Sequence, residues 1–272
     1  MNKLAFVFPG QGAQAVGMGR DFCEQYDVAR KLFAQADEAL GYSIKDMCFD
    51  GPAEDLKLTA NTQPAILTMS VIANEILKEH GVQPDVVGGH SLGEYSALVA
   101  ADVLDFQDAV LLVHKRGQFM QEAVPVGQGG MAAIIGLADE VIIDACEKAT
   151  RAAGEVQAVN FNCPGQTVIA GTNKGVEAAV ELLKEAGAKK AVILPVSAPF
   201  HSTLMKPAGI KLAAELDKVE IRDARIPVVS NYTGELEHTA AEIKANLVAQ
   251  ADHPVKWIAC VNAMKVFGAD TF

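Results

Sequence analysis

Basic residues are scarce in this sequence, and their scarcity limits what the protein can bind. Lysine and arginine number 23 against 34 aspartate and glutamate residues, which gives a net charge of −11 at pH 7. Non-specific binding to nucleic acid or to an anionic membrane surface needs clustered lysine and arginine. We therefore expect no nucleic-acid partner and no membrane partner, and an acidic substrate would have to meet a local positive site.

Long hydrophobic runs are also missing. The apolar run nearest the N-terminus, residues 4–8, ends at Pro9-Gly10, and it is too short for the core of a signal peptide or for a membrane span. The five cysteines are scattered, without a Cys-x-x-Cys pair and without a histidine at metal-ligand spacing. We expect a cytoplasmic protein with reduced thiols, no bound metal and no catalytic cysteine.

Half of the 272 residues are hydrophobic, so the chain can bury a large core. Strand-like runs alternate with amphipathic helical patterns. Strands are predicted at residues 3–8 and 85–89, and helices at 19–41, 62–80 and 106–122. Strands separated by helices pack as a mostly parallel sheet that is covered on both faces. The predicted fold class is α/β.

The order of predicted strands and helices changes in the middle of the chain. Here the order is strand, helix, strand, strand, helix, strand, with a Pro-Gly turn at 162–165 in the central hairpin. This is the order of a split βαβ, ferredoxin-like α+β unit, and Gly- or Pro-rich segments flank it, as they often flank domain crossings. We predict a small domain at 126–195, inserted into a large α/β domain formed by 1–125 and 196–272.

The hexapeptide Gly89-His90-Ser91-Leu92-Gly93-Glu94 lies between a short apolar strand and a helical pattern. A serine with glycines two positions before and after it, at a strand-to-helix turn, is typical of an acyl-transfer nucleophile. The turn lifts the hydroxyl clear of the chain, and the helix points N–H groups at any anion formed there. An ordinary tight turn with a capping serine is the alternative. The flanking strand and helix favour the nucleophile.

A serine nucleophile needs a base, and histidine is the usual one at neutral pH. Of the six histidines, His201 lies in the stiff loop Ser197-Ala198-Pro199-Phe200-His201-Ser202, directly after the last strand of the predicted insert. A loop at a domain junction faces the cleft where ligands bind. His90 adjoins Ser91, and we expect it to have a packing or supporting role. No acidic residue near His201 would orient its ring, so we expect an amide or a backbone carbonyl instead.

An oxyanion hole needs two donors. One is the backbone N–H of Leu92, and the other should come from the loop after the first strand, where Gly10 and Gly12 allow close approach. This loop also loosely matches a dinucleotide-binding fingerprint, but a helical pattern replaces the second strand and acid that such a fold requires. Arg116, inside the helix predicted at 106–122, is either a surface charge or a buried fork that would bind a substrate carboxylate.

Together these motifs resemble the malonyl-CoA:acyl carrier protein transacylases of bacterial type II fatty-acid synthesis. The fold of that family, a hydrolase-like large domain with a ferredoxin-like insertion, agrees with the order of segments above. The matching segments, in order, are Phe8-Pro9-Gly10-Gln11-Gly12-Ala13-Gln14, Gln63-Pro64-Ala65, the Ser91 elbow, Arg116-Gly117, Asn162 with Gly165-Gln166, Pro199-Phe200-His201-Ser202 and Gln250.

The resemblance implies a role for each matching position. Ser91 would be acylated, and His201 would act as general base and then as general acid. The other implied residues are the oxyanion-hole donors Gln11 and Leu92, the carboxylate-binding Arg116, the histidine-orienting Gln250, and the acyl-pocket residues Phe200 and Asn162.

The resemblance also implies the reaction and its partners. Ser91 would take malonyl from malonyl-CoA and pass it to the phosphopantetheine thiol of acyl carrier protein, and a monomer would do this without a cofactor, since the coenzyme A thioester is a substrate. A bulky residue before the active histidine, here Phe200, favours malonyl over methylmalonyl. Because acyl carrier proteins are acidic, as this chain is, we expect a positive patch near the cleft mouth, with Lys189 and Lys190 as candidates.

Two alternatives stay open. A serine esterase or thioesterase would use the same nucleophile with water as the acceptor, although the missing acid partner and Arg116 speak against it. An inactive carrier-protein-binding module is the other, because family members continue past the position of Phe272 with a strand, a Gly-Pro-Gly turn and a closing helix. This chain stops where that strand should begin, so we expect uncovered sheet edge and apolar surface.

Overall fold

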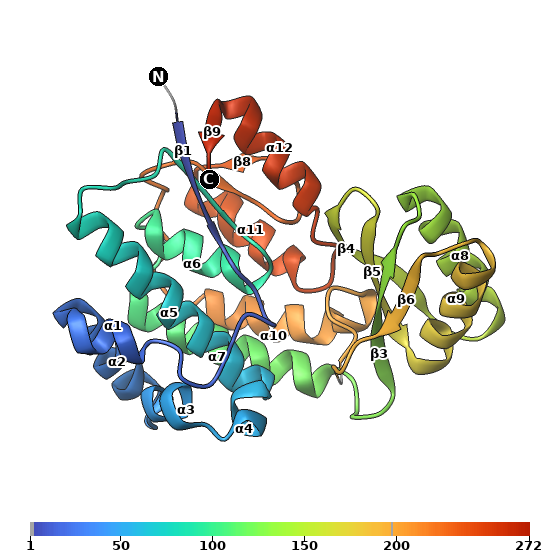
Figure 1. The fold of residues 1–272 in the computed structure, drawn as a ribbon, viewed down its shortest axis with the longest axis horizontal. Helices are drawn as coiled ribbons and strands as arrows, with labels where there is room; N and C mark the ends of the chain where they lie inside the picture. Colours follow the sequence, from blue (N-terminus) through green and yellow to red (C-terminus); the bar gives the residue numbers. More distant parts are fainter. Residues whose placement is uncertain (1–2, 197) are drawn as a thin grey trace.

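The computed structural model describes residues 3–196 and 198–272, and their strands form two separate sheets (Figure 1). Residues 1–2 and Ser197, which we placed in the large domain and in the His201 loop, lie outside the described residues. One or more helices separate most successive strands along the chain. The predicted α/β class is therefore confirmed.

The larger sheet consists of β1 (Lys3–Phe8), β2 (Val86–Gly89), β7 (Val228–Val229), β8 (Leu236–Glu237) and β9 (Ala269–Thr271), in the order β8-β7-β2-β1-β9. β1 pairs in parallel with β2 and β9, and β2 pairs in parallel with β7, whereas β8 is antiparallel at one edge. β2 is buried over its whole length, as expected of a central strand in a covered sheet. The prediction of a mostly parallel sheet is confirmed.

Helices surround this sheet and pack against it in two hydrophobic clusters, and in the larger one Phe33, Leu67, Leu98 and Val113 are fully buried. In the part of the chain that the structure describes, no helix is long and apolar enough to cross a membrane. The helices outside the smaller sheet's unit are α1 (Arg20–Gln25), α2 (Asp27–Leu40), α3 (Ile44–Asp50), α4 (Ala53–Lys57), α5 (Thr59–Glu79), α6 (Leu92–Ala100), α7 (Phe106–Ala123), the 3₁₀ turn η1 (Thr203–Met205), α10 (Lys206–Leu216), α11 (Ala240–Gln250) and α12 (Trp257–Phe267).

The single helix predicted at 19–41 is wrong, because two helices occupy this segment. Tyr26 separates α1 from α2 with an extended backbone, φ −124° and ψ 127°. Its ring contacts the rings of Phe22 and His80, so packing against a distant helix end fixes the break. The pattern also gave no prediction for α3, which Ser43 caps by accepting a hydrogen bond from the N–H of Asp46.

The smaller sheet consists of β3 (Gly129–Ile135), β4 (Val156–Cys163), β5 (Gln166–Thr172) and β6 (Lys190–Ile193), in the order β4-β5-β3-β6 with every pairing antiparallel. With α8 (Asp139–Ala152) and α9 (Asn173–Glu185) in the chain between strands, this is the ferredoxin-like order that we predicted. The unit falls inside the segment 126–195, and whether that segment is a domain of its own stays a prediction.

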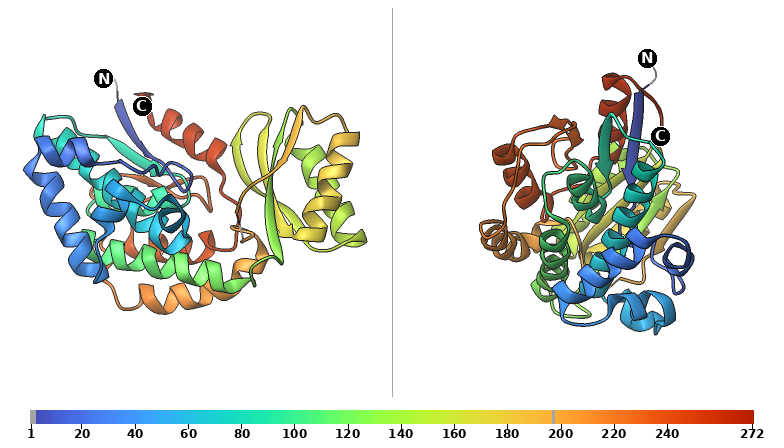
Figure 2. Two further views of the ribbon diagram at one scale, coloured as in Figure 1. Left: turned by 60° about the horizontal axis from the view of Figure 1, so that its bottom comes forward. Right: turned by 90° about the vertical axis from the view of Figure 1, so that its left-hand side faces the viewer.

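The two faces of the smaller sheet have different neighbours. Ala132 and Ile134 of β3 point to the core shared with α8 and α9, which lie on the side turned away from the larger sheet (Figure 2). Side chains alternate along a strand, so Met131 points the other way, into a cluster that contacts Phe200. The uncovered face of the smaller sheet thus meets the loop that carries His201.

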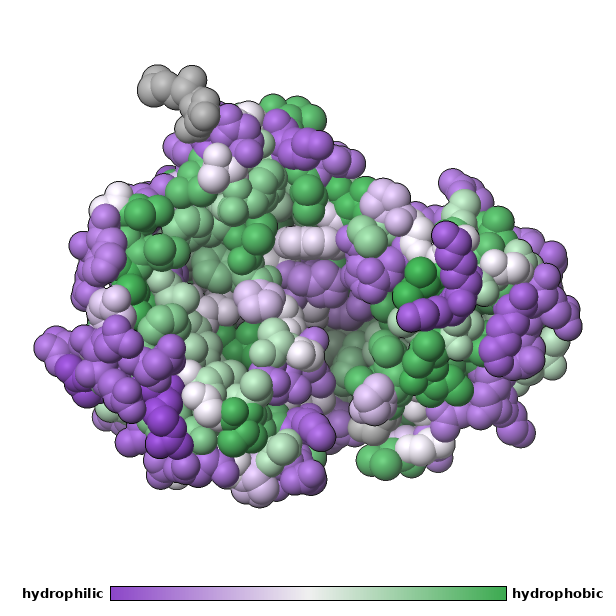
Figure 3. Space-filling view, in the orientation of Figure 1, coloured by the Kyte–Doolittle hydropathy of each residue, from purple (hydrophilic) through white to green (hydrophobic). Residues whose placement is uncertain are grey.

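The expectation that the chain ends before the next strand is wrong, since its last residues form β9 beside β1. The expected apolar surface is present: a groove along β1 and α5 is lined by Leu4, Phe6, Met69 and Phe272, among others. Figure 3 shows hydrophobic residues gathered over these two elements.

Candidate active site

The segment from Gly89 to Glu94 forms a tight turn between β2 and α6. Ser91 lies at its tip with φ 53° and ψ −106°, a combination that non-glycine residues rarely adopt. Hydrogen bonds hold the turn: the N–H of His90 donates to the carbonyl oxygen of Phe8 at 3.0 Å, and the N–H of Gly93 donates to that of His90 at 2.9 Å. This backbone has the geometry of a nucleophile elbow.

The two glycines of the elbow are required for space. A Cβ on Gly89 would lie 2.0 Å from the carbonyl oxygen of Gly93, and a Cβ on Gly93 would lie 2.2 Å from that of Phe8. Both neighbours are backbone atoms of the elbow helix or of β1, so neither can move aside without displacing that element. Glycine at these positions lets the turn and the helix pack directly on the central strands.

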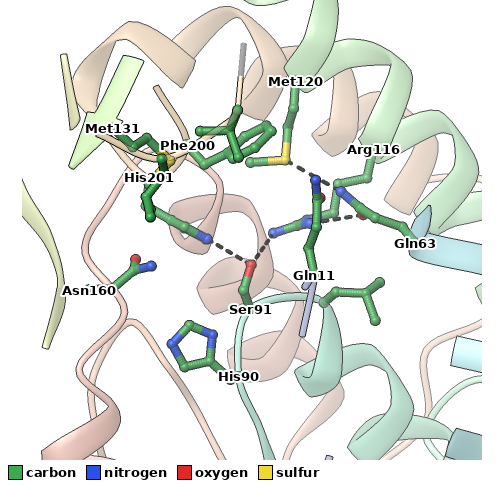
Figure 4. A pocket seen from close by; sticks show the side chains of 13 residues that line it. Gln11, Gln63, His90, Ser91, Arg116, Met120, Met131, Asn160, Phe200 and His201 are labelled. Carbon is green, nitrogen blue, oxygen red and sulfur yellow. Dashed lines mark hydrogen bonds between the residues drawn. The ribbon is translucent and has the colours of Figure 1, made fainter. Parts of the chain in front are cut away.

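His201 is the histidine that the structure brings to the nucleophile. Ser91 Oγ lies 2.7 Å from His201 Nε2 (Figure 4), and Nδ1 of the same ring lies 2.9 Å from the backbone carbonyl oxygen of Gln250. A carbonyl oxygen can only accept, so Nδ1 carries the proton and Nε2 is free to accept the proton of the hydroxyl. The orienting group is thus a carbonyl in place of an acid.

The imidazole of His201 is enclosed by protein. The residue is 2% exposed, and its φ of 62° is a second left-handed value in this site. Burial, followed by the nearby positive charge of Arg116, lowers the pKa of His201 to about 3. At neutral pH the ring is therefore uncharged, which is the form that can accept a proton.

Arg116 of α7 is buried beside the same hydroxyl, with 2% exposed. Its Nη2 donates to Ser91 Oγ at 3.1 Å and to Oε1 of Gln250 at 2.9 Å, and its Nη1 donates to Oε1 of Gln63 at 2.9 Å. All three acceptors are uncharged. Because the side chain is buried, the surface-charge alternative is excluded. The guanidinium lies beside Ser91, where it is available to a carboxylate in the site.

A cavity of about 130 Å³ opens over Ser91, between the larger and the smaller sheet. Gln11, Leu92 and Phe200 line it, and Met131 and Leu194 close it from the smaller sheet. Leu92 is the first residue of α6, so its N–H has no partner inside the helix. The two residues predicted to supply an oxyanion hole therefore both lie at the cavity that contains the nucleophile.

Asn162 does not line this cavity, contrary to the prediction. Its Oδ1 lies 2.8 Å from Nε2 of His90, and His90 itself faces the cavity. The pairing of β4 with β5 is irregular on both sides of Phe161, so Asn160 reaches the lining instead. A bulge of this kind reorients side chains, and the sequence pattern does not reveal it.

Two buried residues that sequence reasoning missed complete the site beneath the elbow, Asn231 and Glu94. The Oδ1 of Asn231 accepts a hydrogen bond from the N–H of Ser91 at 2.6 Å, and its Nδ2 donates to the carbonyl oxygen of Gly89 at 2.7 Å. A usable signal existed for each. Asn231 follows β7 at the carboxyl edge of a parallel sheet, where sites gather, and Glu94 is the one charged residue of its helix.

One cysteine contacts the site: the Sγ of the buried Cys260 accepts a hydrogen bond from Nδ2 of Asn231 at 3.8 Å. All five cysteines are free, with Cys163 exposed at the end of β4 and Cys48, Cys146 and Cys260 buried. Across residues 3–196 and 198–272, no group of three or more His, Cys, Asp or Glu side chains is placed to hold a metal ion.

A serine at an elbow, hydrogen-bonded to a neutral histidine that a further group orients, is the arrangement of enzymes that move acyl groups. The sequence profile of the acyl transferase domain matches residues 5–265. The chain therefore belongs to the acyl transferase domain family.

Individual relatives are similar along nearly the whole chain. The malonyl CoA-acyl carrier protein transacylase of Bacillus subtilis is 51% identical over 272 residues, which cover 100% of this chain and 86% of the relative. The crystal structure of an acyl carrier protein S-malonyltransferase from Vibrio cholerae has a TM-score of 0.96 at 51% identity, covering 99% of this chain and 88% of that one. A type II PKS acyl-carrier protein in complex with its malonyl-transacylase gives a TM-score of 0.96 at 45% identity, with 98% and 87% covered. The family resemblance found in the motifs is confirmed.

Proposed function

We propose that the protein transfers a malonyl group from malonyl-CoA to the phosphopantetheine thiol of an acyl carrier protein through an acyl-enzyme at Ser91. The observation that carries the proposal is the position of Ser91 Oγ, 2.7 Å from His201 Nε2 and 3.1 Å from Arg116 Nη2. The first contact activates the hydroxyl, and the second places a fixed positive charge beside the incoming acyl group. The names of the relatives, a transacylase and an S-malonyltransferase, support the same reaction.

In the first half-reaction, Ser91 Oγ attacks the thioester carbonyl of malonyl-CoA while His201 Nε2 takes the hydroxyl proton. The backbone N–H groups of Leu92 and Gln11 stabilise the resulting oxyanion. Collapse of the tetrahedral intermediate breaks the carbon–sulfur bond, and the sulfur of coenzyme A takes the proton from His201. Ser91 then carries the malonyl ester.

The second half-reaction reverses these steps with a different thiol. The phosphopantetheine thiol of the carrier protein gives its proton to His201 Nε2 and attacks the ester carbonyl. The ester bond to Ser91 breaks, and Ser91 Oγ takes the proton back. Coenzyme A enters as part of a substrate, so the cycle uses no cofactor and follows ping-pong kinetics.

Selection of malonyl rests on Arg116 and Phe200. The guanidinium fork of Arg116 binds the free carboxylate of the malonyl group through charge-assisted hydrogen bonds, which acetyl cannot make. The ring of Phe200 lines the cavity and packs against Met120 and Met131. Because Met120 and Met131 hold the Phe200 ring in place, the ring leaves no room for an α-methyl group, and methylmalonyl is excluded.

The proposal extends to the state of the protein. We propose a monomer in the cytoplasm that meets its carrier protein by diffusion, since the transfer needs one carrier at a time. Sedimentation of the purified protein at micromolar concentration measures the oligomeric state, and a dimer would contradict the proposed monomer.

A two-substrate assay tests the function. With malonyl-CoA and a holo carrier protein, we expect malonyl carrier protein as the product and parallel lines in double-reciprocal plots, and Ser91→Ala should remove both. Release of free malonate as fast as transfer would identify a thioesterase. Binding of the carrier protein without either product would identify an inactive binding module.

A further inference from the structure

A buried acid lies directly beneath the nucleophile elbow. Glu94, in the first turn of α6, has no exposed surface. One carboxylate oxygen, Oε2, accepts two hydrogen bonds, from the N–H of Asn231 and from Nε2 of Gln250, each at 2.9 Å. These donors come from different parts of the chain, so one carboxylate oxygen connects the turn after β7 with the end of α11.

The first donor holds the nucleophile. While its N–H donates to Glu94, the side chain of Asn231 accepts from the N–H of Ser91 at 2.6 Å and donates to the carbonyl oxygen of Gly89 at 2.7 Å. These bonds fix the backbone on the N-terminal side of Ser91, a residue whose φ is positive. The position of Ser91 Oγ therefore depends on where Asn231 is held.

The second donor holds the base and the arginine. The backbone carbonyl of Gln250 orients His201, and the side-chain Oε1 of Gln250 accepts from Arg116 at 2.9 Å. Its Nε2, which donates to Glu94, also donates to the carbonyl oxygen of Ser91 at 3.0 Å. Gln250 thus contacts the nucleophile, the base and the arginine, and Glu94 anchors its amide.

We propose that Glu94 is a positioning residue, which holds Ser91, His201 and Arg116 in register through Asn231 and Gln250. The inference rests on the proposed function only in that these three residues carry it out. Glu94 acts through its hydrogen bonds and takes no part in proton transfer, because Asn231 and Gln250 stand between it and the reacting atoms.

The surroundings of the carboxyl group agree with an acceptor that need not be charged. Burial raises the pKa of Glu94 to about 7, although the hydrogen bonds from Gln250 and Asn231 and the charge of Arg116 lower it. The other titratable groups that interact with it are Tyr95, Glu237 and Cys260. Among the described residues, its second oxygen, Oε1, has no hydrogen-bond partner. A neutral amide oxygen in place of Oε2 would make the same two bonds.

Two substitutions of Glu94 distinguish the effect of side-chain length from the effect of side-chain charge. Glu94→Gln keeps the length and the acceptor but removes the charge, whereas Glu94→Asp keeps the charge but shortens the side chain by one methylene. We expect Glu94→Gln to retain the wild-type kcat and Glu94→Asp to lower it roughly 10- to 100-fold, since a displacement of about 1 Å at a reacting group has effects of that size. The KM for malonyl-CoA should change little, because Gln63 also holds Arg116.

The control is Leu98→Ala, which removes a fully buried side chain of the same helix that faces the hydrophobic core. It should lower stability more than Glu94→Asp does and leave kcat unchanged. The rate at which an organophosphonate labels Ser91 is measured in parallel, because this probe reports an activated serine whatever the natural acyl donor. The inference would be overturned if Glu94→Asp were labelled at the wild-type rate. It would also be overturned if the labelling rate of Glu94→Gln or of Leu98→Ala fell as much as that of Glu94→Asp. A wild type that the phosphonate labels but malonyl-CoA does not acylate would contradict the proposed function alone.

Discussion

At the scale of single residues, the site depends on how a few polar side chains are shared. Ser91 Oγ donates to the imidazole of His201 and accepts from the guanidinium of Arg116. The two neighbours also affect each other, since the charge of Arg116 helps to keep His201 neutral. One arginine can therefore serve both the base, by excluding its charged form, and the acyl group, by binding its carboxylate.

Replacement of Arg116 tests the second of these roles. Arg116→Ala should reduce malonyl transfer by about ten- to a few hundred-fold for each charge-assisted bond lost, on the basis of 1.5–3 kcal/mol per bond, and should spare or raise acetyl transfer. Competition between malonyl-CoA and acetyl-CoA, measured as the ratio of kcat/KM values, gives the result. Arg116→Lys is the matched control, because it keeps the charge without the fork and should be intermediate. An unchanged malonyl preference in Arg116→Ala would rule out the carboxylate contact.

Residues that react could be predicted from the sequence more readily than residues that support them. Ser91 and His201 lie in short motifs whose chemistry is local: glycines around a serine, and a proline-stiffened loop around a histidine. Asn231 and Glu94 act through contacts with residues more than a hundred positions away in the chain. Their local signals, a position after a strand and a lone charge in a helix, mark them as candidates but do not show what they contact. The sequence also could not show that Asn160, and not Asn162, lines the cavity, because this depends on an irregular pairing between β4 and β5.

At the scale of secondary-structure elements, the packing of α6 on β1 and β2 places the nucleophile. This packing requires glycine, since a Cβ on Gly93 would meet the carbonyl oxygen of Phe8 at 2.2 Å. The elbow was predictable because strand, glycines and helix are adjacent in sequence. The break at Tyr26 was not, because no proline or glycine marks it and contacts with Phe22 and His80 decide it.

A pair of glycine substitutions tests this account of the elbow. Gly93→Ala should lower the free energy of unfolding by about 1–3 kcal/mol or more, as overpacking does, and should remove labelling of Ser91. Gly209→Ala is the matched control: Gly209 is inside α10, its Cβ would make ordinary contacts at 3.5 and 3.7 Å, and the change should stabilise the protein by about 0.4–1 kcal/mol. Urea unfolding measures both. Equal stability of Gly93→Ala and wild type would contradict the packing argument.

At the scale of the whole molecule, stability should depend on pH through buried acids. Burial, and then the neighbouring Glu94, raises the pKa of Glu237 to about 8. A carboxyl whose folded pKa is raised binds more protons in the folded state, so its contribution to stability is present below the unfolded pKa and is lost as pH rises through the folded pKa. The lowered pKa of His201 acts at the acid end, where stability falls as pH drops from about 6.5 to about 3.

The prediction is a loss of stability as pH rises from about 4.5 to about 8 that is smaller in Glu237→Gln. The amide can still accept from Nδ2 of Asn246, the donor to Glu237, so the folded structure should keep that contact. Urea unfolding of the variant and of wild type at several pH values gives the difference in slope, to which exposed groups common to both proteins do not contribute. Parallel curves for the two proteins would show that Glu237 does not titrate with folding.

The charge of the whole molecule bears on its partner. With a net charge of −11, the chain would repel an acidic carrier protein unless local positive groups guide it. Lys189 and Lys190 are exposed where β6 begins, and the residue after β6, Leu194, lines the cavity. One short strand therefore leads from these lysines to the catalytic cavity.

Salt should slow the second half-reaction. We expect kcat/KM for the carrier protein to fall about tenfold as salt rises from low to several hundred millimolar, because the surface attraction is screened. A Lys189→Glu/Lys190→Glu double variant should already be slow at low salt, with acylation by malonyl-CoA intact. Lys148→Glu, on α8 at the far side of the smaller sheet, is the control and should behave as wild type. Rates that do not respond to salt would exclude an electrostatic docking surface.

The central claim is that Ser91 carries a malonyl group between two thiols. Intact mass spectrometry of the protein after brief exposure to malonyl-CoA without carrier protein, followed by peptide mapping, tests it directly. The account predicts one malonyl adduct, located on Ser91, that disappears when holo carrier protein is added and does not form in Ser91→Ala. An adduct elsewhere, or none in a protein that still transfers malonyl, would contradict it.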